Sequence, residues 1–355
     1  MRRGFLLIQK GRTRDWTSAT QRIARQIKFT SPGLLRKKNQ CIISWSSLVF
    51  LTNPTPTISS TMPLPLVHYL YRSGLPKYFR QDSNGESSWA LVTGASDGIG
   101  WELSRQLAER GFNVILHGRN TAKLSRCRSE LEASFPARHF RTIAVDASAF
   151  TDADIDRIVA TTTDIPLTIL VNNVGGTAPL SSNFKHFEDY TTAEIDAVFS
   201  LNITFPLKLT RAILPRFQAQ SSPTLVLTCG SQSQIGQAYV AGYSATKGAL
   251  HTWSRALAAE QYESKSQVEI LEVIVGGTYT QQLQKDPNMK PGVFMPTAEI
   301  MARAALARVG HGHRWVVGYW GHWVQGFLLY TCLPGWMADS VVAGILKPSV
   351  EAKKT

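Results

Sequence analysis

Short apolar runs alternate with longer segments of helical periodicity from about residue 88 onward. This alternation is typical of a parallel sheet whose strands are buried on both faces and joined by crossover helices. The predicted strands are Trp89–Thr93, Asn113–His117, Thr142–Asp146, Leu167–Asn172, Thr224–Thr228, Glu269–Val275 and Arg314–Gly318. The predicted helices are 99–110, 121–134, 151–163, 192–219, 241–262 and 297–308. The pattern therefore predicts a single α/β domain with a doubly wound, parallel, seven-stranded sheet.

The positive charge of the chain is concentrated near its start. The formal net charge is +13, but residues 1–40 hold eleven Lys and Arg against Asp15 alone. The remainder is close to neutral and gives no reason to expect nucleic-acid binding. Residues 1–61 have the composition of a mitochondrial presequence, a basic membrane anchor or an inert extension, with Met62 as an alternative start. We expect this extension to be poorly ordered and to be followed by a lead-in segment at 62–87.

The end of the chain is aromatic and uncharged. No Asp, Glu, Lys or Arg occurs between Trp315 and Ala338, whereas four tryptophans do. Two interpretations stay open: the segment docks on a membrane surface, or it forms a lid over a substrate pocket or part of a homodimer interface. Glycines and Pro334 argue against one straight membrane-spanning helix. We therefore place the main domain at 88–320 and a separate aromatic segment at 321–355.

A glycine-rich motif follows the first predicted strand. Its sequence is Thr93-Gly94-Ala95-Ser96-Asp97-Gly98-Ile99-Gly100. The glycines permit a tight turn and let backbone N–H groups approach a pyrophosphate at the N-terminus of the next helix. Because the motif lies between a predicted strand and a predicted helix, it indicates a dinucleotide site in a Rossmann-like fold.

The choice between NAD and NADP is usually made about 20 residues farther along the chain. The sequence there is His117-Gly118-Arg119-Asn120, with no carboxylate for a ribose 2′-hydroxyl. Arg119 offers a planar, permanently charged group to a 2′-phosphate, and the alternative is a surface ion pair, for example with Asp97. The sequence therefore predicts NADP(H).

Tyr243 and Lys247 stand four positions apart within the predicted helix 241–262. This spacing places both side chains on one helix face. A cation beside a phenol favours the phenolate, so the hydroxyl can exchange a proton with a substrate oxygen. Taken alone, however, a Tyr and a Lys four positions apart occur often by chance, and a solvated helix face explains the pair better.

Together and in this order, the motifs resemble the short-chain dehydrogenase/reductase family over roughly residues 88–320. They are Thr93–Gly100, Asn172-Asn173-Val174-Gly175, Ser231, and Tyr243 with Lys247. Within that family the chain is most similar to the branch of microsomal very-long-chain 3-oxoacyl-CoA reductases and 17β-hydroxysteroid dehydrogenases. The resemblance implies an oxidoreductase that transfers a hydride between NADP(H) and a ketone or secondary alcohol of a hydrophobic substrate.

The resemblance also implies roles for individual residues. Tyr243 would be the general acid/base, Lys247 would assist it and hold the nicotinamide ribose, Ser231 would bond the carbonyl oxygen, and Asn202 would hold a relay water. The implied cofactor-binding residues are Gly94, Ser96, Asp97, Gly98, Ile99, Gly100, Arg119, Asp146, Asn172, Gly175, Tyr243, Lys247 and Thr280. The scattered cysteines show no metal-ligand spacing, so no metal is expected.

Two features depart from the family pattern. The family usually has Pro-Gly where this chain has Val275-Gly276, which alters the floor under the nicotinamide. Ser231 lies twelve residues before Tyr243, one fewer than is common in the branch, and Ser233 is a nearby competitor.

Several functions and locations stay open. The substrate is a 3-oxoacyl thioester, a steroid or a hydrophobic secondary metabolite, or else the protein is a catalytically silent NADP-binding scaffold. The presence of both Tyr243 and Lys247 argues against the scaffold. We expect association with the endoplasmic reticulum membrane, with mitochondrial and cytoplasmic locations as alternatives. Residues 351–355 resemble a dilysine retrieval signal but lack its usual positions, so they do not support this location.

Overall fold

The structure is a computed structural model that describes residues 67–81, 85–281, 283–285 and 289–351. The chain divides into two units, Met1–Met62 and Pro63–Thr355. The account below concerns the second unit. The predicted basic extension and most of the C-terminal dilysine-like sequence lie outside the described residues.

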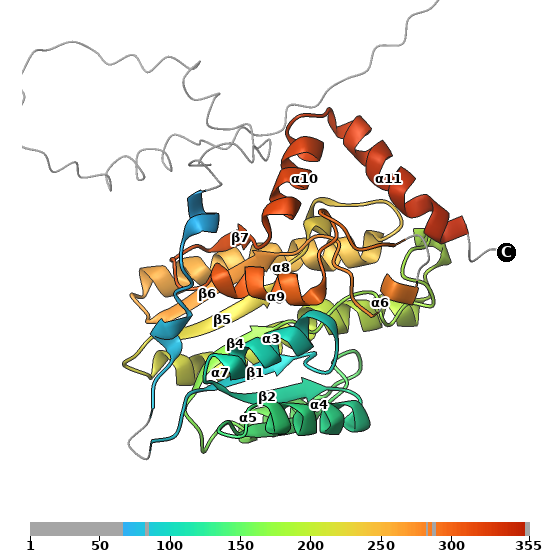
Figure 1. The fold of residues 1–355 in the computed structure, drawn as a ribbon. Helices are drawn as coiled ribbons and strands as arrows, with labels where there is room; N and C mark the ends of the chain where they lie inside the picture. Colours follow the sequence, from blue (N-terminus) through green and yellow to red (C-terminus); the bar gives the residue numbers. More distant parts are fainter. Residues whose placement is uncertain (1–66, 82–84, 282, 286–288, 352–355) are drawn as a thin grey trace, which may run out of the picture. The chain divides into compact units, whose positions relative to one another are not determined.

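Seven parallel strands form one sheet (Figure 1). They are β1 (Trp89–Thr93), β2 (Asn113–Gly118), β3 (Phe140–Ala144), β4 (Leu167–Asn172), β5 (Thr224–Cys229), β6 (Val268–Ile274) and β7 (Trp315–Val317). Their order across the sheet is β3-β2-β1-β4-β5-β6-β7. This arrangement confirms the predicted parallel α/β fold and the number of strands.

One strand prediction was displaced by two residues. The sequence pattern predicted Thr142–Asp146, whereas β3 spans Phe140–Ala144. The strand stops early because the Asp146 carboxylate accepts hydrogen bonds from the backbone N–H and the hydroxyl of Ser148, at 2.9 and 2.7 Å. Such a side-chain turn competes with continued strand pairing.

The helices lie between the strands and after the last of them. They are α3 (Gly98–Glu109), α4 (Thr121–Ser134), α5 (Asp152–Ala160), α6 (Thr192–Phe199), α7 (Phe205–Gln218), α8 (Ala241–Glu263), α9 (Ala298–Ala307), α10 (Trp320–Tyr330) and α11 (Gly335–Glu351). The predicted helix 151–163 ends at Ala160, because the hydroxyls of Thr161, Thr162 and Thr163 donate to the last carbonyls of α5. The predicted helix 192–219 is interrupted by a π-helical turn at Ser200–Thr204.

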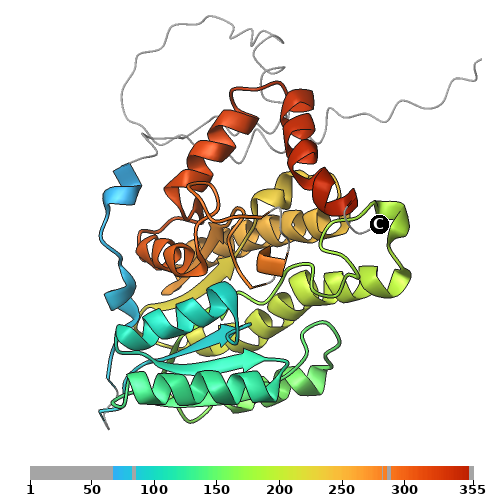
Figure 2. The same ribbon diagram turned by 45° about the vertical axis from the view of Figure 1, so that its right-hand side comes forward.

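Helices cover both faces of the sheet (Figures 1 and 2). Successive strand residues point to opposite faces, so Val92 packs in one core with residues of α3, α4 and α9. Its neighbour Leu91 packs in the other core with residues of α5, α7 and α8. The strands are therefore buried on both sides, as their uninterrupted apolar sequences predict.

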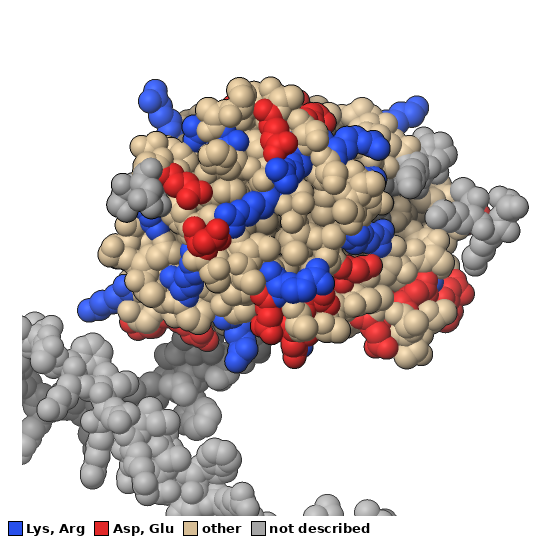
Figure 3. Space-filling model, turned by 90° about the horizontal axis from the view of Figure 1, so that it is seen from below, with Lys and Arg blue, Asp and Glu red and all other residues tan. Residues whose placement is uncertain are grey.

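The charged side chains of both signs are mixed on the surface. Figure 3 shows one face of the molecule, on which Lys and Arg are interspersed with Asp and Glu.

Within the described part of the chain, one helical stretch, Thr192–Gln218, is long and apolar enough to cross a membrane. Phe205, Leu209, Ile213 and Phe217 of this stretch are buried in the core of the domain.

Replacing Leu131 with alanine tests the packing of α4 on the sheet. Leu131 is 1% exposed and belongs to the core under α3 and α4. We expect Leu131→Ala to lower the free energy of unfolding by about 2–5 kcal/mol. Its exposed neighbour offers a control, since Glu130→Ala should change that free energy by less than about 0.5 kcal/mol. Equal effects in urea unfolding would contradict this packing.

Candidate functional site

The sequence-predicted residues collect at the carboxyl end of the sheet, where the strand order reverses. From β1 the chain moves outward to β2 and β3, whereas β4 returns to the other side of β1. The loops after β1 and β4 therefore diverge, and a crevice at such a switch point is the usual ligand site of open α/β sheets.

The turn after β1 has the backbone geometry of a phosphate cradle. Gly94 and Gly98 have φ values of +66° and +53°, which glycine adopts without strain. A Cβ atom on Gly100 would lie 2.1 Å from the Gly94 carbonyl oxygen, so the turn closes only with glycine there. The N-cap residue of α3, Asp97, makes no capping hydrogen bond with its side chain. The first N–H groups of α3 are thus available to a pyrophosphate, and the turn fits a dinucleotide.

Two residues that belong to the quoted motifs but were given no role, Thr93 and Asn173, hold this turn against the loop after β4. The Thr93 hydroxyl oxygen accepts hydrogen bonds from the backbone N–H groups of Asn173 and Val174, at 2.9 and 3.0 Å. The Asn173 side chain donates to the Thr93 carbonyl oxygen at 3.0 Å. Their position at the ends of two adjacent strands was the available signal for both.

Charged groups surround the end of β2. Arg119 is exposed and makes no ion pair with any described residue, while Asp97 pairs with Lys123 at 3.2 Å. The predicted alternative partner of Arg119 is therefore engaged elsewhere. Burial raises the pKa of the Asp146 carboxyl. The hydrogen bonds from Ser148 and the charge of Arg119 lower that pKa by more than burial raises it, so the net shift is downward. Arg119 and Asp146 thus lie near each other, and Lys123 adds a cation that the motif analysis did not select.

Lys247 lies at the centre of the predicted catalytic group. Its side chain is 4% exposed, and its ammonium donates to the Cys229 carbonyl oxygen at 2.8 Å, at the end of β5. The same ammonium lies 5.7 Å from the centre of the Tyr243 ring. A Cβ atom on Gly175 would lie 3.4 Å from Lys247 Nζ. Residues that follow β4 and β5 and residues of α8 therefore meet at this ammonium.

Asn202 lies in the π-helical turn between α6 and α7 and clamps the loop after β4. Its side-chain amide donates to the carbonyl oxygens of Val198 and Gly176, at 3.0 and 2.9 Å. Its Oδ1 accepts from the N–H of Gly176 at 2.8 Å. Both amide hydrogens are thereby engaged with the backbone, so a relay water would have to bind Oδ1 or a backbone carbonyl. π-Helical turns often occur at functional sites.

Ser231 and its competitor Ser233 have different surroundings. Ser231 precedes the short 3₁₀ turn Gln232–Ile235, is 8% exposed, and its Oγ accepts from the Ser233 N–H at 3.1 Å. The Ser233 hydroxyl instead donates to the Gln237 side chain at 2.8 Å. Since Ser231 lies closer to the end of β5 and its proton is not used in that contact, the geometry favours Ser231.

Two other predicted cofactor residues, Thr280 and Ser96, lie near glycines that follow or end these strands, whereas Asn172 does not face them. The methyl group of Thr280 lies 3.2 Å from the position that a Cβ on Gly98 would take. Ser96 Oγ lies 3.2 Å from the corresponding position on Gly118. The Asn172 side chain is buried and donates to the Thr210 hydroxyl at 2.8 Å, so it points toward α7.

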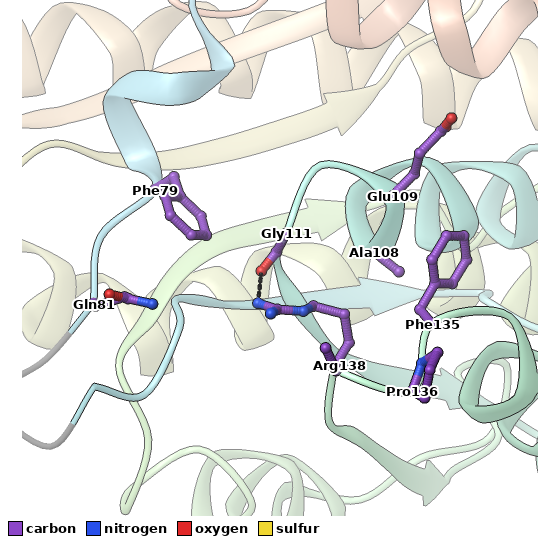
Figure 4. A pocket seen from close by; sticks show the side chains of 9 residues that line it. Phe79, Gln81, Ala108, Glu109, Gly111, Phe135, Pro136 and Arg138 are labelled. Carbon is purple, nitrogen blue, oxygen red and sulfur yellow. Dashed lines mark hydrogen bonds between the residues drawn. The ribbon is translucent and has the colours of Figure 1, made fainter.

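A separate hollow lies at the opposite end of the sheet. Figure 4 shows its lining, in which Arg138 donates to the Gly111 carbonyl oxygen at 2.7 Å. Gly111 precedes the start of β2, whereas the glycine turn follows the end of β1. This hollow is therefore remote from the predicted catalytic residues.

Known proteins are similar to this chain in sequence and in fold. The family model described as short chain dehydrogenase matches residues 88–291. A very-long-chain 3-oxoacyl-CoA reductase of Ajellomyces capsulatus (strain NAm1 / WU24) is 31% identical over 255 residues, which cover 70% of this chain and 73% of that protein.

Two solved structures show the likeness in the fold. One comes from work on the stereoselectivity of 7beta-hydroxysteroid dehydrogenase, with a TM-score of 0.64 at 19% identity over 76% of this chain and 98% of that chain. The other is a short-chain dehydrogenase from Sphingobium yanoikuyae in complex with NADPH, with a TM-score of 0.57 at 24% identity over 71% and 96%. The chain therefore belongs to the short-chain dehydrogenase/reductase family and is an NAD(P)-dependent oxidoreductase that acts on CH–OH and C=O groups.

Proposed function

We propose that this protein uses NADPH to reduce a ketone on a hydrophobic substrate, a 3-oxoacyl-CoA or a steroid-like ketone, to a secondary alcohol. The observation that carries the proposal is the buried Lys247 ammonium, which lies between the Cys229 carbonyl and the Tyr243 ring. A cation in this place favours negative charge on the neighbouring phenol oxygen, as proton transfer requires.

The reaction divides the work between the cofactor and the protein. When bound, NADPH supplies the hydride that adds to the carbonyl carbon. Tyr243 gives its hydroxyl proton to the carbonyl oxygen, so the products are an alcohol, NADP⁺ and a tyrosinate that regains a proton from solvent. Ser231 donates a hydrogen bond to the oxygen as negative charge develops there. Lys247 stabilises the tyrosinate and bonds the nicotinamide ribose.

The choice of NADPH over NADH rests on the end of β2. Arg119 is exposed, has no ion-pair partner within the described segments and is not accompanied by a carboxylate in the sequence 117–120. A guanidinium in this state can bond a 2′-phosphate with two parallel hydrogen bonds. Lys123, on the first turn of α4, adds a second positive charge nearby.

The substrate class is supported by the relative from Ajellomyces capsulatus, which is named as a very-long-chain 3-oxoacyl-CoA reductase. The aromatic residues of α10 are suited to an apolar substrate. A ketone of a secondary metabolite is the alternative substrate. A catalytically silent scaffold is disfavoured, because Tyr243 and Lys247 are both present and close to each other.

We also propose that the protein docks on the endoplasmic reticulum membrane through α10 and α11. These helices leave the body as a bent pair (Figures 1 and 2). Their exposed apolar side chains, here named the α10–α11 apolar face, are Trp320, Phe327, Leu328, Trp336, Met337, Val341 and Ile345. The charged residues of the pair, Asp339, Lys347 and Glu351, all lie in α11 after Ala338. Exposed tryptophan beside such polar groups is suited to the interface of a bilayer rather than to its interior.

Removing the Tyr243 hydroxyl tests the proposed chemistry. We expect Tyr243→Phe to lower kcat for a long-chain 3-oxoacyl-CoA about 10²–10⁴-fold, because the proton donor is lost. The loss of NADPH absorbance measures turnover, and NADPH fluorescence checks that binding persists. Tyr262→Phe, on the same helix and 73% exposed, should leave kcat unchanged. Full activity in Tyr243→Phe would refute the assigned role.

Replacing Arg119 tests the cofactor preference. Arg119→Ser should raise the Kd of NADPH about 10–100-fold and leave that of NADH nearly unchanged, since a charge-assisted bond to the 2′-phosphate is lost. Arg126→Ser, which removes an exposed arginine of α4, should affect neither cofactor. An equal rise in the Kd of NADPH and of NADH would show that Arg119 does not bind the 2′-phosphate.

Vesicle binding tests the docking surface. Full-length protein should sediment with phosphatidylcholine vesicles, and the double variant Trp336→Ser/Ile345→Ser should bind them at least about tenfold more weakly, because two apolar side chains no longer insert. The double variant Phe187→Ser/Tyr262→Ser removes exposed apolar groups elsewhere and serves as the control. Salt should have little effect, since the face carries no charge. A dimer that the first double variant dissociates, without vesicle binding, would overturn the proposal.

A further inference from the structure

His322 lies on the first turn of α10 and is fully buried. Its imidazole contacts the loop that follows β6. The N–H of Gly276 donates to Nδ1 at 3.0 Å, and Nε2 faces the Gly277 carbonyl oxygen at 3.0 Å. Two consecutive residues of one loop therefore occupy both ring nitrogens.

Only a neutral imidazole can make both contacts. A backbone N–H can only donate, so Nδ1 carries no proton and Nε2 must carry it and donate to Gly277. Burial lowers the pKa of His322 to about 4, although the bond to the Gly277 carbonyl acts in the opposite direction. The ring is therefore neutral near pH 7 and holds the loop from both sides.

Gln232 joins this cluster to the end of β5. Its side-chain amide donates to the His322 carbonyl oxygen at 2.7 Å, and its backbone N–H donates to the Val275 carbonyl oxygen at 2.9 Å. A Cβ atom on Gly326 would lie 3.2 Å from the Gln232 amide nitrogen, so this position on α10 leaves room for the amide. Gln232 directly follows Ser231. The ends of β5 and β6 and the first turns of α10 are thus bonded together.

The loop needs an external support because it begins with the pair Gly276-Gly277. Glycine has more backbone freedom than any other residue, and the chain lacks the proline that restricts this loop elsewhere in the family. A Cβ on Gly276 would lie only 2.6 Å from His322 Cδ2, so close packing against the imidazole requires glycine. Farther on, the loop reaches Thr280, whose methyl group lies over Gly98 of the glycine turn.

We propose that His322 is a positioning residue for the nicotinamide end of the cofactor. It holds the Gly276-Gly277 pair, and through that pair Thr280, in the conformation that receives NADP(H). The inference rests on the proposed function. It also gives the aromatic C-terminal segment a part in cofactor binding, because His322 connects α10 to the floor of the site.

Three substitutions at this position separate the two contacts. His322→Ala removes both, His322→Asn can keep the acceptor for Gly276, and His322→Gln can keep the donor for Gly277. We expect His322→Ala to raise the Kd of NADPH about tenfold and to speed amide exchange in peptides that contain Gly276. His322→Asn should recover most of the amide protection and part of the affinity. Val324→Ala, two positions farther along α10 and so on the other side of that helix from His322, should leave both readouts unchanged.

NADPH binding by the wild-type protein separates failure of the proposed function from failure of the positioning role. If wild type does not bind NADPH, the proposed function fails. If wild type binds NADPH and His322→Ala binds it equally well, the positioning role is overturned. Should His322→Ala fail to fold, Gln232→Ala offers a second route, because it removes the amide that bonds the His322 carbonyl oxygen and keeps both partners of the imidazole. We then expect about a threefold higher Kd and faster exchange of the same peptides, and unchanged values would also overturn the role.

Discussion

The buried ammonium of Lys247 is the interaction on which the rest of the site depends. A charged group that is 4% exposed is costly to bury unless it is bonded, and the Cys229 carbonyl oxygen supplies a bond at 2.8 Å. That bond ties α8 to the end of β5, so it sets where Tyr243 stands relative to Ser231. Gly175 leaves space for the ammonium from the side of β4. A Cβ atom there would also lie 2.8 Å from Asn202 Oδ1, so a side chain would displace the Asn202 amide.

At the predicted cofactor site the arrangement depends on the close approach of backbone segments to one another. Gly94 and Gly100 touch through their main chains, and the Thr93 hydroxyl bonds the two backbone N–H groups that follow Asn172. The ends of β1 and β4 are therefore held together without large side chains between them. This leaves N–H groups at the start of α3 free to face an anion. The loop after β6 uses glycine similarly, but there His322 supplies the hydrogen bonds.

The sequence was sufficient to predict the parts of the fold that follow from local pattern. Apolar runs located all seven strands, and the Tyr243–Lys247 spacing predicted correctly that these two side chains lie near each other. The end of β3 was missed because the turn that Asp146 makes with Ser148 stops the strand. The helices α10 and α11 were not predicted, since their apolar residues lack a polar face to mark the period and glycines interrupt them.

Contacts between residues far apart in sequence were beyond prediction. Nothing in the sequence near His322 shows that its ring meets Gly276 and Gly277, 46 and 45 positions away. The same holds for Asn202, whose amide bonds the Gly176 backbone through a π-helical turn that has no clear sequence signature. Such contacts arise from how the strand ends converge, which depends on the whole sheet.

Transfer of deuterium from labelled cofactor tests the central claim most directly. The purified full-length protein would be incubated with a long-chain 3-oxoacyl-CoA and NADPH carrying deuterium at the transferable position of nicotinamide C4, and the product would be analysed by mass spectrometry. The account predicts a 3-hydroxyacyl-CoA with one deuterium on the carbon that bears the new hydroxyl. NADPH that binds tightly but delivers no deuterium to this substrate or to a steroid ketone would contradict it.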